Sequence, residues 1–360
     1  MKKICFTIDT NTSGGAERVT SVLANYFAGH TYDVFVINSD RDTHFYEMND
    51  SVHVVKMQLD TSEKGRFASL KRFFQKFNFL RKWIQKEKPD VVVTFLFNME
   101  APTILAGLLT HTKVFTSVRN SVKAFSKEVN FFRRLFYPKI AGVIFQSQNV
   151  MNAPMFRHVK NAKVIMNPLS ENKMNISPCA SRERNNHIIS VGRLHSQKNQ
   201  KMLISAFSMI AEEFCDLELH IYGEGPLRNE LQNQIRELAL ENRVFLEGAV
   251  NDAVLLNKDA RLFVMSSDYE GFPNALVEAM AVGIPVISTD FDSGVAALLI
   301  NDSYNGFLCP VGDVNALTEK MRTALNKEIE IDTIVSRAIE TVKNLYPEKI
   351  CAEWEEFLSR

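Results

Sequence analysis

Two carboxylates flank the start of an expected helix in the segment EGFPNALVEAMAVGIPVIST, residues 270–289. The Gly-Phe-Pro sequence after Glu270 interrupts regular backbone, and a helix is expected over 274–282, with Glu278 about one turn inside it. The first turn of a helix has unpaired N–H groups and a partial positive charge, so it suits a phosphate. The arrangement therefore suits a sugar nucleotide, whose diphosphate has hydroxyls on both sides. A capped core helix with two solvated glutamates fits the same residues equally well.

Two cations follow another expected strand, in SVGRLHSQKNQ, residues 190–200. Arg193 lies at the end of the strand and Lys198 at the start of the next helix, so both can reach one ligand. Two fixed cations can neutralise a diphosphate leaving group by electrostatics alone, without a metal. The alternative is a solvated loop with unrelated charges.

Two glycine pairs follow expected strands. Gly14 and Gly15 open a helix in SGGAERV, and Gly223 and Gly225 precede one in YGEGPLRNEL. Glycines permit a positive φ and a close backbone approach, so such loops can bind anions. The second pair is no full dinucleotide fingerprint, because Arg228 replaces its third glycine. Taken alone, a tight strand-to-helix turn explains the first pair better than a ligand does.

Residues 270–289 closely resemble the donor-site signature of the retaining glycosyltransferases of family four, which have the GT-B fold. The resemblance implies that Glu270 lies beside the donor sugar and that Glu278 holds the ribose hydroxyls of the nucleotide. That family places the two glutamates eight residues apart, as they are here. The resemblance also implies that the sugar and diphosphate are lined by the backbone of Phe272, Pro273, Asn274 and Ala275.

Further motifs resemble the same family in the same order. Arg193 and Lys198 match its GR…K element, whose two cations bind the donor phosphates, although Asn199 replaces the glycine that commonly follows the lysine. Gly223 and Gly225 match a G-x-G-P-L element that shapes the nucleotide pocket. These similarities imply that Arg193, Lys198 and Glu270 take part in catalysis.

The acceptor side is less well defined. The resemblance implies that Gly15 faces the donor phosphate and Gly14 the acceptor. Family members often have a histidine near the end of the fifth strand, whereas this chain has Arg119 and Asn120 there. Arg119 can meet a phosphate or acceptor charge and Asn120 a sugar hydroxyl, or both can be structural. A second departure is Ala297, where a glutamate is usual.

No cofactor or metal is expected. The five cysteines are scattered without a CxxC pair, and the histidines show no metal-ligand spacing, so we expect reduced thiols and no zinc. Two DxD triplets, at 40–42 and 290–292, each follow an expected strand, and chance explains them better than a metal site. The formal net charge is zero, which gives no reason to expect a nucleic acid partner.

Strand and helix patterns alternate along the chain, which predicts an α/β protein with parallel sheets. With the resemblance, this implies a GT-B fold of two Rossmann-like, doubly wound domains facing across a cleft. We expect an acceptor-binding domain over 1–167, a linker over 168–186, and a domain that binds the nucleotide-sugar donor over 187–344. The C-terminal helix, within 345–360, is expected to pack back on the first domain.

A basic, aromatic helix is expected near the middle of the first domain. Between Lys64 and Lys88 there are nine lysines or arginines and one acid, Glu87. Apolar residues from Phe67 to Ile84 recur at intervals of three and four, which gives one apolar helical face. A second basic aromatic stretch runs over 119–139. Basic amphipathic helices of this kind bind anionic lipid surfaces, whereas one such helix alone is more often a core helix.

These observations favour a retaining, metal-independent glycosyltransferase of the hexosyltransferase class. The expected donor is a UDP-hexose or UDP-N-acetylhexosamine. The expected acceptor is a lipid-linked saccharide of surface polysaccharide or glycan biosynthesis, used by a protein peripheral to the inner face of the cytoplasmic membrane. Two alternatives stay open: a GT-B nucleotide-sugar epimerase or hydrolase acting on a soluble substrate, and a non-catalytic scaffold of a polysaccharide assembly complex.

Overall fold

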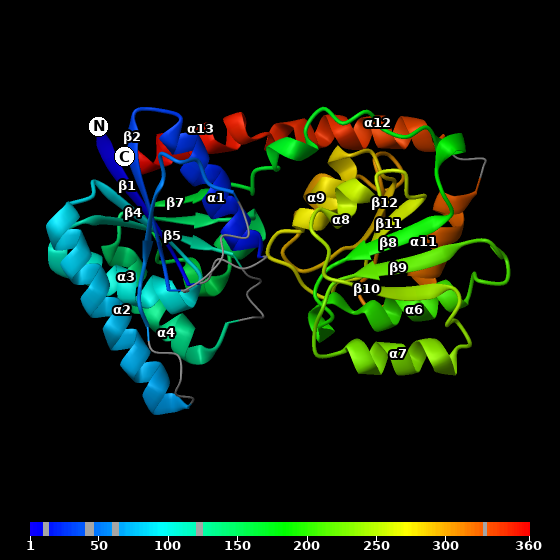
Figure 1. Ribbon diagram of the computed structural model, residues 1–360, viewed down its shortest axis with the longest axis horizontal. Helices are drawn as coiled ribbons and strands as arrows, with labels where there is room; N and C mark the ends of the chain where they lie inside the picture. Colours follow the sequence, from blue (N-terminus) through cyan, green and yellow to red (C-terminus); the bar gives the residue numbers. More distant parts are fainter. Residues whose placement is uncertain (10–13, 40–46, 60–64, 120–124, 327–329) are drawn as a thin grey trace. The chain divides into compact units, whose positions relative to one another are not determined.

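The structure is a computed structural model, and it describes residues 1–9, 14–39, 47–59, 65–119, 125–326 and 330–360. The chain forms two compact units (Figure 1). The first consists of Met1–Pro168 with Pro347–Arg360, and the second consists of Leu169–Tyr346. Residues 169–186 thus belong to the second unit.

The first unit is built on a seven-stranded parallel sheet with the order β3-β2-β1-β4-β5-β6-β7. Its central strands are nearly continuous apolar runs, as expected for a parallel sheet that is covered on both faces. The strands are β1 (Lys2–Ile8), β2 (Tyr32–Asn38), β3 (His53–Lys56), β4 (Val91–Phe95), β5 (Lys113–Val118), β6 (Gly142–Phe145) and β7 (Ala162–Val164).

The helices of the first unit include the C-terminal one. They are α1 (Gly15–Ala28), α2 (Arg66–Glu87), α3 (Phe97–Thr110), α4 (Lys127–Phe136), α5 (Gln148–Met151) and α13 (Pro347–Leu358). Trp354 and Phe357 on α13 are fully buried, and the Phe357 ring contacts that of Phe115 on β5 with centroids 5.5 Å apart. Glu355 accepts a hydrogen bond of 2.9 Å from the Tyr32 hydroxyl. The last helix therefore completes the core of the first unit.

The second unit is built on a six-stranded parallel sheet with the order β10-β9-β8-β11-β12-β13. The strands are β8 (His187–Val191), β9 (Glu218–Tyr222), β10 (Val244–Gly248), β11 (Leu262–Met265), β12 (Val286–Thr289) and β13 (Phe307–Cys309). The helices are α6 (Gln200–Ser208), α7 (Arg228–Glu237), α8 (Ala253–Leu256), α9 (Asn274–Ala281), α10 (Val295–Leu299), α11 (Val314–Leu325) and α12 (Ile331–Val342).

The structure confirms the parallel sheets that the alternating strand and helix patterns predict. The strand β13 at the sheet edge lies in the middle of the segment 303–313, whose Asn305-Gly306 and Gly312-Asp313 pairs are typical of turns. Three residues between Gly306 and Pro310 are too few to show the alternation of a strand. The helix α11 follows, and Asp313 gives the usual signal for its start by capping the amide of Ala316.

A buried ion pair joins α3 to α4 in the first unit. Glu100 is fully buried and accepts hydrogen bonds from Arg133 of 3.1 and 2.8 Å and from the Tyr137 hydroxyl of 2.8 Å. Burial and the adjacent Glu100 carboxylate raise the pKa of Tyr137 well above its usual value, so the hydroxyl remains a donor. Removing one charge would leave the other buried and uncompensated.

We expect Glu100→Ala to lower the free energy of unfolding by about 3–5 kcal/mol, because Arg133 stays buried without its counterion. Urea denaturation followed by circular dichroism measures this. The double variant Glu100→Ala with Arg133→Met should recover most of the loss. Glu87→Ala, which removes a partly exposed partner of Lys3, should change the urea midpoint much less. If Glu100→Ala were as stable as wild type, the buried ion pair would not be what stabilises the packing of α4 on α3.

Candidate functional site

Glu270 is the best-fixed acid in the second unit. It follows β11, and its side chain is almost fully buried. One carboxylate oxygen accepts hydrogen bonds from the Lys198 ammonium at 2.5 Å and the Ser267 hydroxyl at 2.7 Å. The other accepts one from the amide of Gln197 at 3.3 Å. Three donors therefore hold Glu270 as an oriented anion whose charge is matched by one lysine.

Lys198 and Arg193 lie in the connection between β8 and α6. The Lys198 side chain runs past Gly192, where an added Cβ would lie 3.1 Å from the lysine Cε. The Arg193 side chain is exposed, and within the described ranges its guanidinium pairs with no carboxylate. The connection therefore presents one cation that is held by Glu270 and, next to Gly192, a second that is open to solvent.

Gly223 and Gly225 let the chain after β9 pack directly on this connection. A Cβ on Gly223, whose φ is +147°, would lie 2.1 Å from the carbonyl oxygen of Gly192, and one on Gly225 would lie 2.3 Å from that of Leu194. Backbone hydrogen bonds join the two segments, including one of 3.0 Å from the Leu194 amide to the Glu224 carbonyl. These glycines thus fix the backbone on either side of Arg193.

The helix α9 begins at Asn274, as the sequence predicts. Phe272 and Pro273 before it are buried, Asn274 and Ala275 are half-buried, and Pro273 provides no side-chain cap. The amides of the first turn have no partners within a helix, so they can bind an anion. Glu278 lies further along the same helix and is 5% exposed. The α9 start, Glu270, Lys198 and Arg193 all follow the carboxyl ends of parallel strands, the edge at which such sheets bind ligands.

In the first unit, Gly14 and Gly15 stand at the start of α1, and Gly14 provides no side-chain cap. The Glu17 side chain folds back over this end, because a Cβ on Gly14 would lie 2.0 Å from its carboxylate. Glu17 itself is buried, at 5% exposure. Since its carboxylate already lies where an anion would bind, a neutral hydroxyl fits this loop better than a phosphate.

Arg119, after β5, is held by its own unit. Its guanidinium donates a 2.7 Å hydrogen bond to the Asn167 side chain and lies over the rings of Phe95 and Trp354, 4.7 and 6.0 Å from their centroids. Burial lowers the pKa of Arg119 to about 9, partly offset by Glu17, so the side chain stays charged at neutral pH. These contacts favour the structural alternative. Asn120 lies outside the described residues.

A cavity of about 750 Å³ opens between α2, α3 and α4. Asp9 and Ser39, which follow β1 and β2, line it together with Lys76, Phe97 and other residues. Asp9 forms an ion pair with Lys76 and accepts a 2.8 Å hydrogen bond from the Ser39 hydroxyl. Burial alone would raise the pKa of Asp9, but Lys76 and its hydrogen-bond donors lower it below the usual value. The cavity thus has an ionic end and aromatic walls.

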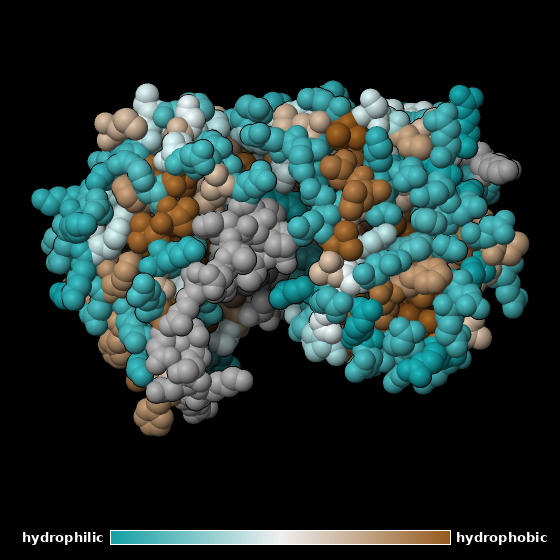
Figure 2. Space-filling model, viewed as in Figure 1, coloured by the Kyte–Doolittle hydropathy of each residue, from teal (hydrophilic) through white to brown (hydrophobic). Residues whose placement is uncertain are grey.

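The helix α2 differs between its two halves. Leu80 and Ile84 in its second half are buried, whereas Phe67, at 91% exposure, Leu70 and Phe74 in its first half are exposed. Figure 2 shows apolar side chains among hydrophilic ones over this part of the unit. The apolar face of α2 that the sequence predicts therefore packs into the core in the second half of the helix and is exposed to solvent in the first half.

The helix α4 also exposes apolar side chains, at Phe131 and Leu135. Lys76 on α2, one of the nine basic residues between Lys64 and Lys88, is buried against Asp9. None of the described helices is both long and apolar enough to cross a membrane.

The sequence contains two DxD triplets, at 40–42 and 290–292. Residues 40–42 lie outside the described residues. Asp290 and Asp292 are exposed after β12.

Two family models together match most of the chain. The model for glycosyltransferase family 4 matches residues 13–168, and the model for glycosyl transferases group 1 matches residues 174–341. Their boundary falls close to that between the two compact units.

Two enzymes of Campylobacter jejuni are similar along almost the whole chain. One is the α-1,4-N-acetyl-D-galactosaminyltransferase that acts on GalNAc-α-(1→4)-GalNAc-α-(1→3)-diNAcBac-PP-undecaprenol; it is 30% identical over 98% of this chain and 97% of its own. The other is the N-acetylgalactosamine-N,N'-diacetylbacillosaminyl-diphospho-undecaprenol 4-α-N-acetylgalactosaminyltransferase, which is 28% identical over 91% of each chain.

A solved structure shares the fold of both units. The HepE protein of Anabaena, in complex with UDP and glucose, superimposes with a TM-score of 0.79 at 21% identity over the whole of both chains. With the matches above, this likeness confirms the expected fold class and enzyme class. The chain belongs to family 4 of the glycosyltransferases and has the GT-B fold.

Proposed function

We propose that the protein transfers a hexose or N-acetylhexosamine, with retention of anomeric configuration and without a metal, from a nucleotide sugar to a lipid-linked saccharide. The observation that carries this is the group around Glu270 in the second unit. Lys198 is held there at 2.5 Å from the carboxylate, Arg193 is open to solvent, and α9 begins without a side-chain cap. Two cations and a helix start are what a departing nucleoside diphosphate needs.

The donor is bound through its diphosphate and its sugars. Arg193, Lys198 and the first turn of α9 stabilise the phosphates, with the backbone from Phe272 to Ala275 beside the sugar. Glu278 binds the ribose hydroxyls, as the family resemblance implies. We propose UDP as the nucleotide, supported by the UDP-bound structure of HepE, and we assign to Gly223 and Gly225 the shaping of its pocket.

Glu270 orients groups and is no nucleophile in this proposal. Its carboxylate accepts three hydrogen bonds, one of them from an ammonium, and these contacts fix its position in the site. When the donor binds, its phosphate shares Lys198 with Glu270, and the carboxylate accepts a hydrogen bond from the donor sugar. The base that deprotonates the acceptor hydroxyl is then an oxygen of the departing phosphate on the same face of the sugar, which accounts for retention.

The acceptor is assigned to the first unit. The names of the two Campylobacter enzymes specify acceptors on diphosphate-linked undecaprenol, which have a saccharide, two phosphates and a long apolar chain. The cavity beside α2 offers matching chemistry, because Arg72 and Lys76 lie in its wall together with Phe132 and Phe136. Gly14 and Gly15 are assigned to acceptor and donor-sugar hydroxyls. Arg119 holds Asn167 in place and contributes its positive charge.

The exposed apolar side chains on α2 and α4 are assigned to a membrane surface. Lys71, Arg134 and Lys139 are exposed near them. Cations beside an apolar patch favour anionic lipid, and each contributes about 1 kcal/mol near such a surface. A peripheral position on the inner face of the cytoplasmic membrane would bring the protein to an acceptor whose lipid stays in the bilayer.

Acceptor-dependent release of nucleoside diphosphate tests the function. The protein is incubated with a panel of nucleotide sugars, with and without a diphosphate-linked polyprenyl saccharide. We expect release of UDP and a longer saccharide only when both substrates are present. Fast release or sugar isomerisation without an acceptor would identify the hydrolase or epimerase instead, and no turnover with any donor would favour the scaffold.

We expect Arg193→Ala and Lys198→Ala each to lower kcat by about 10²-fold or more, because each removes a preorganised cation from the leaving group. Binding of free UDP, measured by calorimetry, should weaken in both. Lys201→Ala is a matched control three residues from Lys198, since Lys201 pairs with exposed Glu230. Kinetics close to wild type in both site variants would reject the assignment of the leaving-group cations.

Activity should survive excess EDTA at 25 °C, because the cations and the helix start do the work of a metal ion. The transfer rate is measured before and after chelation, and again after addition of Mn²⁺ or Mg²⁺. Complete loss that Mn²⁺ or Mg²⁺ restores would contradict a metal-independent transfer and return attention to the DxD triplets.

The protein should co-sediment with anionic vesicles at low salt and dissociate as salt rises. The triple variant Phe67→Ser, Phe74→Ser and Phe131→Ser should bind vesicles less and lose activity on a lipid-linked acceptor. A short, water-soluble acceptor should be used about as well as by wild type.

The control for the vesicle experiment replaces exposed apolar residues of the second unit, in the double variant Met209→Ser with Leu256→Ser. This variant should bind vesicles as wild type does. Equal losses on the two kinds of acceptor would show that the exposed residues of α2 and α4 support the fold, and undiminished vesicle binding would show that another surface meets the lipid.

A further inference from the structure

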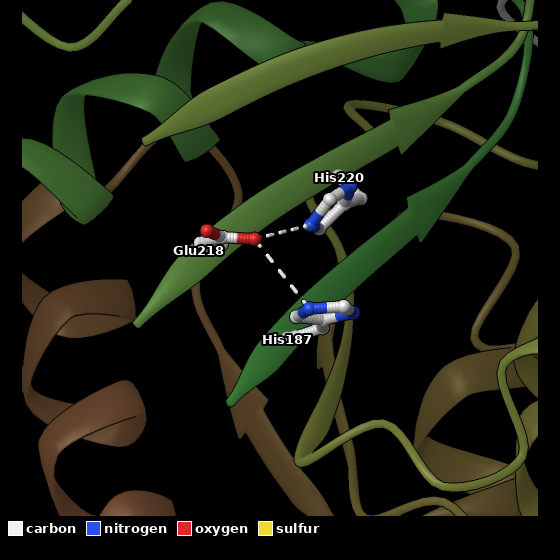
Figure 3. A group of neighbouring side chains, drawn as sticks. All are labelled: His187, Glu218 and His220. Carbon is white, nitrogen blue, oxygen red and sulfur yellow. Dashed lines mark hydrogen bonds and ion pairs between the residues drawn. The ribbon is translucent and has the colours of Figure 1, made fainter. Parts of the chain in front are cut away.

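Two histidines and a glutamate converge on one face of the sheet in the second unit. His187 is the first residue of β8, and Glu218 and His220 lie two residues apart on the adjacent strand β9 (Figure 3). His187 pairs in register with Glu218, and side chains two apart on a strand point to the same face, so the three lie together. Their neighbours Ile188 and Leu219 point to the opposite face, into the core.

The ligand atoms are spaced as a small metal ion requires. The Glu218 carboxylate oxygen lies 3.4 Å from Nε2 of His187 and 3.1 Å from Nε2 of His220, and one such atom from each residue lies within 4.8 Å of the others. Atoms bound to tetrahedral zinc at about 2.0–2.1 Å are about 3.4 Å apart. The two separations from Glu218 are already close to this length, and that between the two histidines is at most 4.8 Å.

A second carboxylate orients His220. Glu247 on β10 lies 2.6 Å from Nδ1 of His220, and the His220 ring stacks on Phe245 with centroids 5.0 Å apart. A histidine that donates from Nδ1 to a carboxylate presents the lone pair of Nε2, and this carboxylate–histidine arrangement is the usual support of a zinc ligand. Glu247 is therefore placed to accept a hydrogen bond from Nδ1 of His220 when Nε2 binds a metal.

The group is partly open to solvent. The side chains of His187 and Glu218 are 35% and 38% exposed, whereas that of His220 is 12% exposed. An ion could enter from the surface and keep one position for water.

The group lies at the amino ends of the strands. The length of β8 alone places it about 13 Å from the carboxyl edge of the sheet, at roughly 3.3 Å per residue. An ion there is outside the group of donor-binding residues.

We propose that His187, Glu218 and His220 bind one Zn²⁺ ion, oriented by Glu247, which joins β8 to β9 and stabilises the second unit. Imidazole nitrogens select zinc and its first-row neighbours over Mg²⁺ and Ca²⁺, which prefer oxygen ligands. An ion that binds only the folded chain shifts the unfolding equilibrium toward the native state. The site is independent of the proposed transfer reaction and has a structural role.

The test uses the full chain after treatment with EDTA and gel filtration. Isothermal calorimetry should show one Zn²⁺ bound per chain, and Zn²⁺ but not Mg²⁺ should raise the Tm. His187→Gln and His220→Gln should abolish both effects, and Glu247→Gln should weaken binding about 10–100-fold, as loss of such a support does. The Co²⁺-loaded protein should show the visible absorption of a site with nitrogen ligands.

Two controls separate this site from other zinc-binding groups. His53→Gln replaces a histidine that contacts a single carboxylate, Asp33, and Cys215→Ser removes an exposed thiol. Both should bind Zn²⁺ as wild type does. Circular dichroism confirms that each variant folds. Absence of stoichiometric binding, or equal binding by His187→Gln and His220→Gln, overturns the proposal. Zinc binding that Cys215→Ser abolishes assigns the ion to the thiol and overturns it as well.

Discussion

A buried carboxylate needs positive charge and hydrogen-bond donors, and this requirement organises the second unit around Glu270. Little water reaches its carboxylate, so protein groups must stabilise the anion. Lys198 and Gln197, from the connection after β8, and Ser267, from the connection after β11, donate hydrogen bonds to it. Holding Lys198 there fixes the chain after β8, and Gly223 and Gly225 let the chain after β9 close over that segment. One desolvated charge thus places a lysine and the start of α9 at the same edge of the sheet before any ligand arrives.

What the sequence predicted well is local. Parallel strands buried on both faces read as apolar runs, and Pro273 before Asn274 marks a helix start, so the two sheets and α9 could be placed from the residues alone. The acids and cations assigned to the donor stand directly after such elements. Their positions follow from the strand ends, whereas the ion pair between Lys198 and Glu270, 72 residues apart, needed the fold.

The misses come from contacts between segments distant in the sequence. The residues around Lys76 in the sequence give no sign of its ion pair with Asp9. Helical periodicity alone predicts a solvent-exposed lysine there. Likewise, His187 and Glu218 are far apart in the chain but adjacent in register, so their spacing resembles no metal motif. A sequence signal did exist in the Glu-x-His pair of β9, because two such side chains share one face of a strand.

The second sheet separates two tasks by its direction. At the carboxyl edge, the residues that we propose to bind the donor must stay available to a ligand, and the Arg193 side chain is exposed there. At the amino edge, His187, Glu218 and His220 need not bind a substrate. Their contacts with one another can act only to stabilise the second unit. A parallel sheet makes this division simple, because every connection that enters a strand lies at one edge and every connection that leaves lies at the other. A metal ion that stabilises the amino edge therefore need not restrict the loops at the carboxyl edge, to which we assign the chemistry.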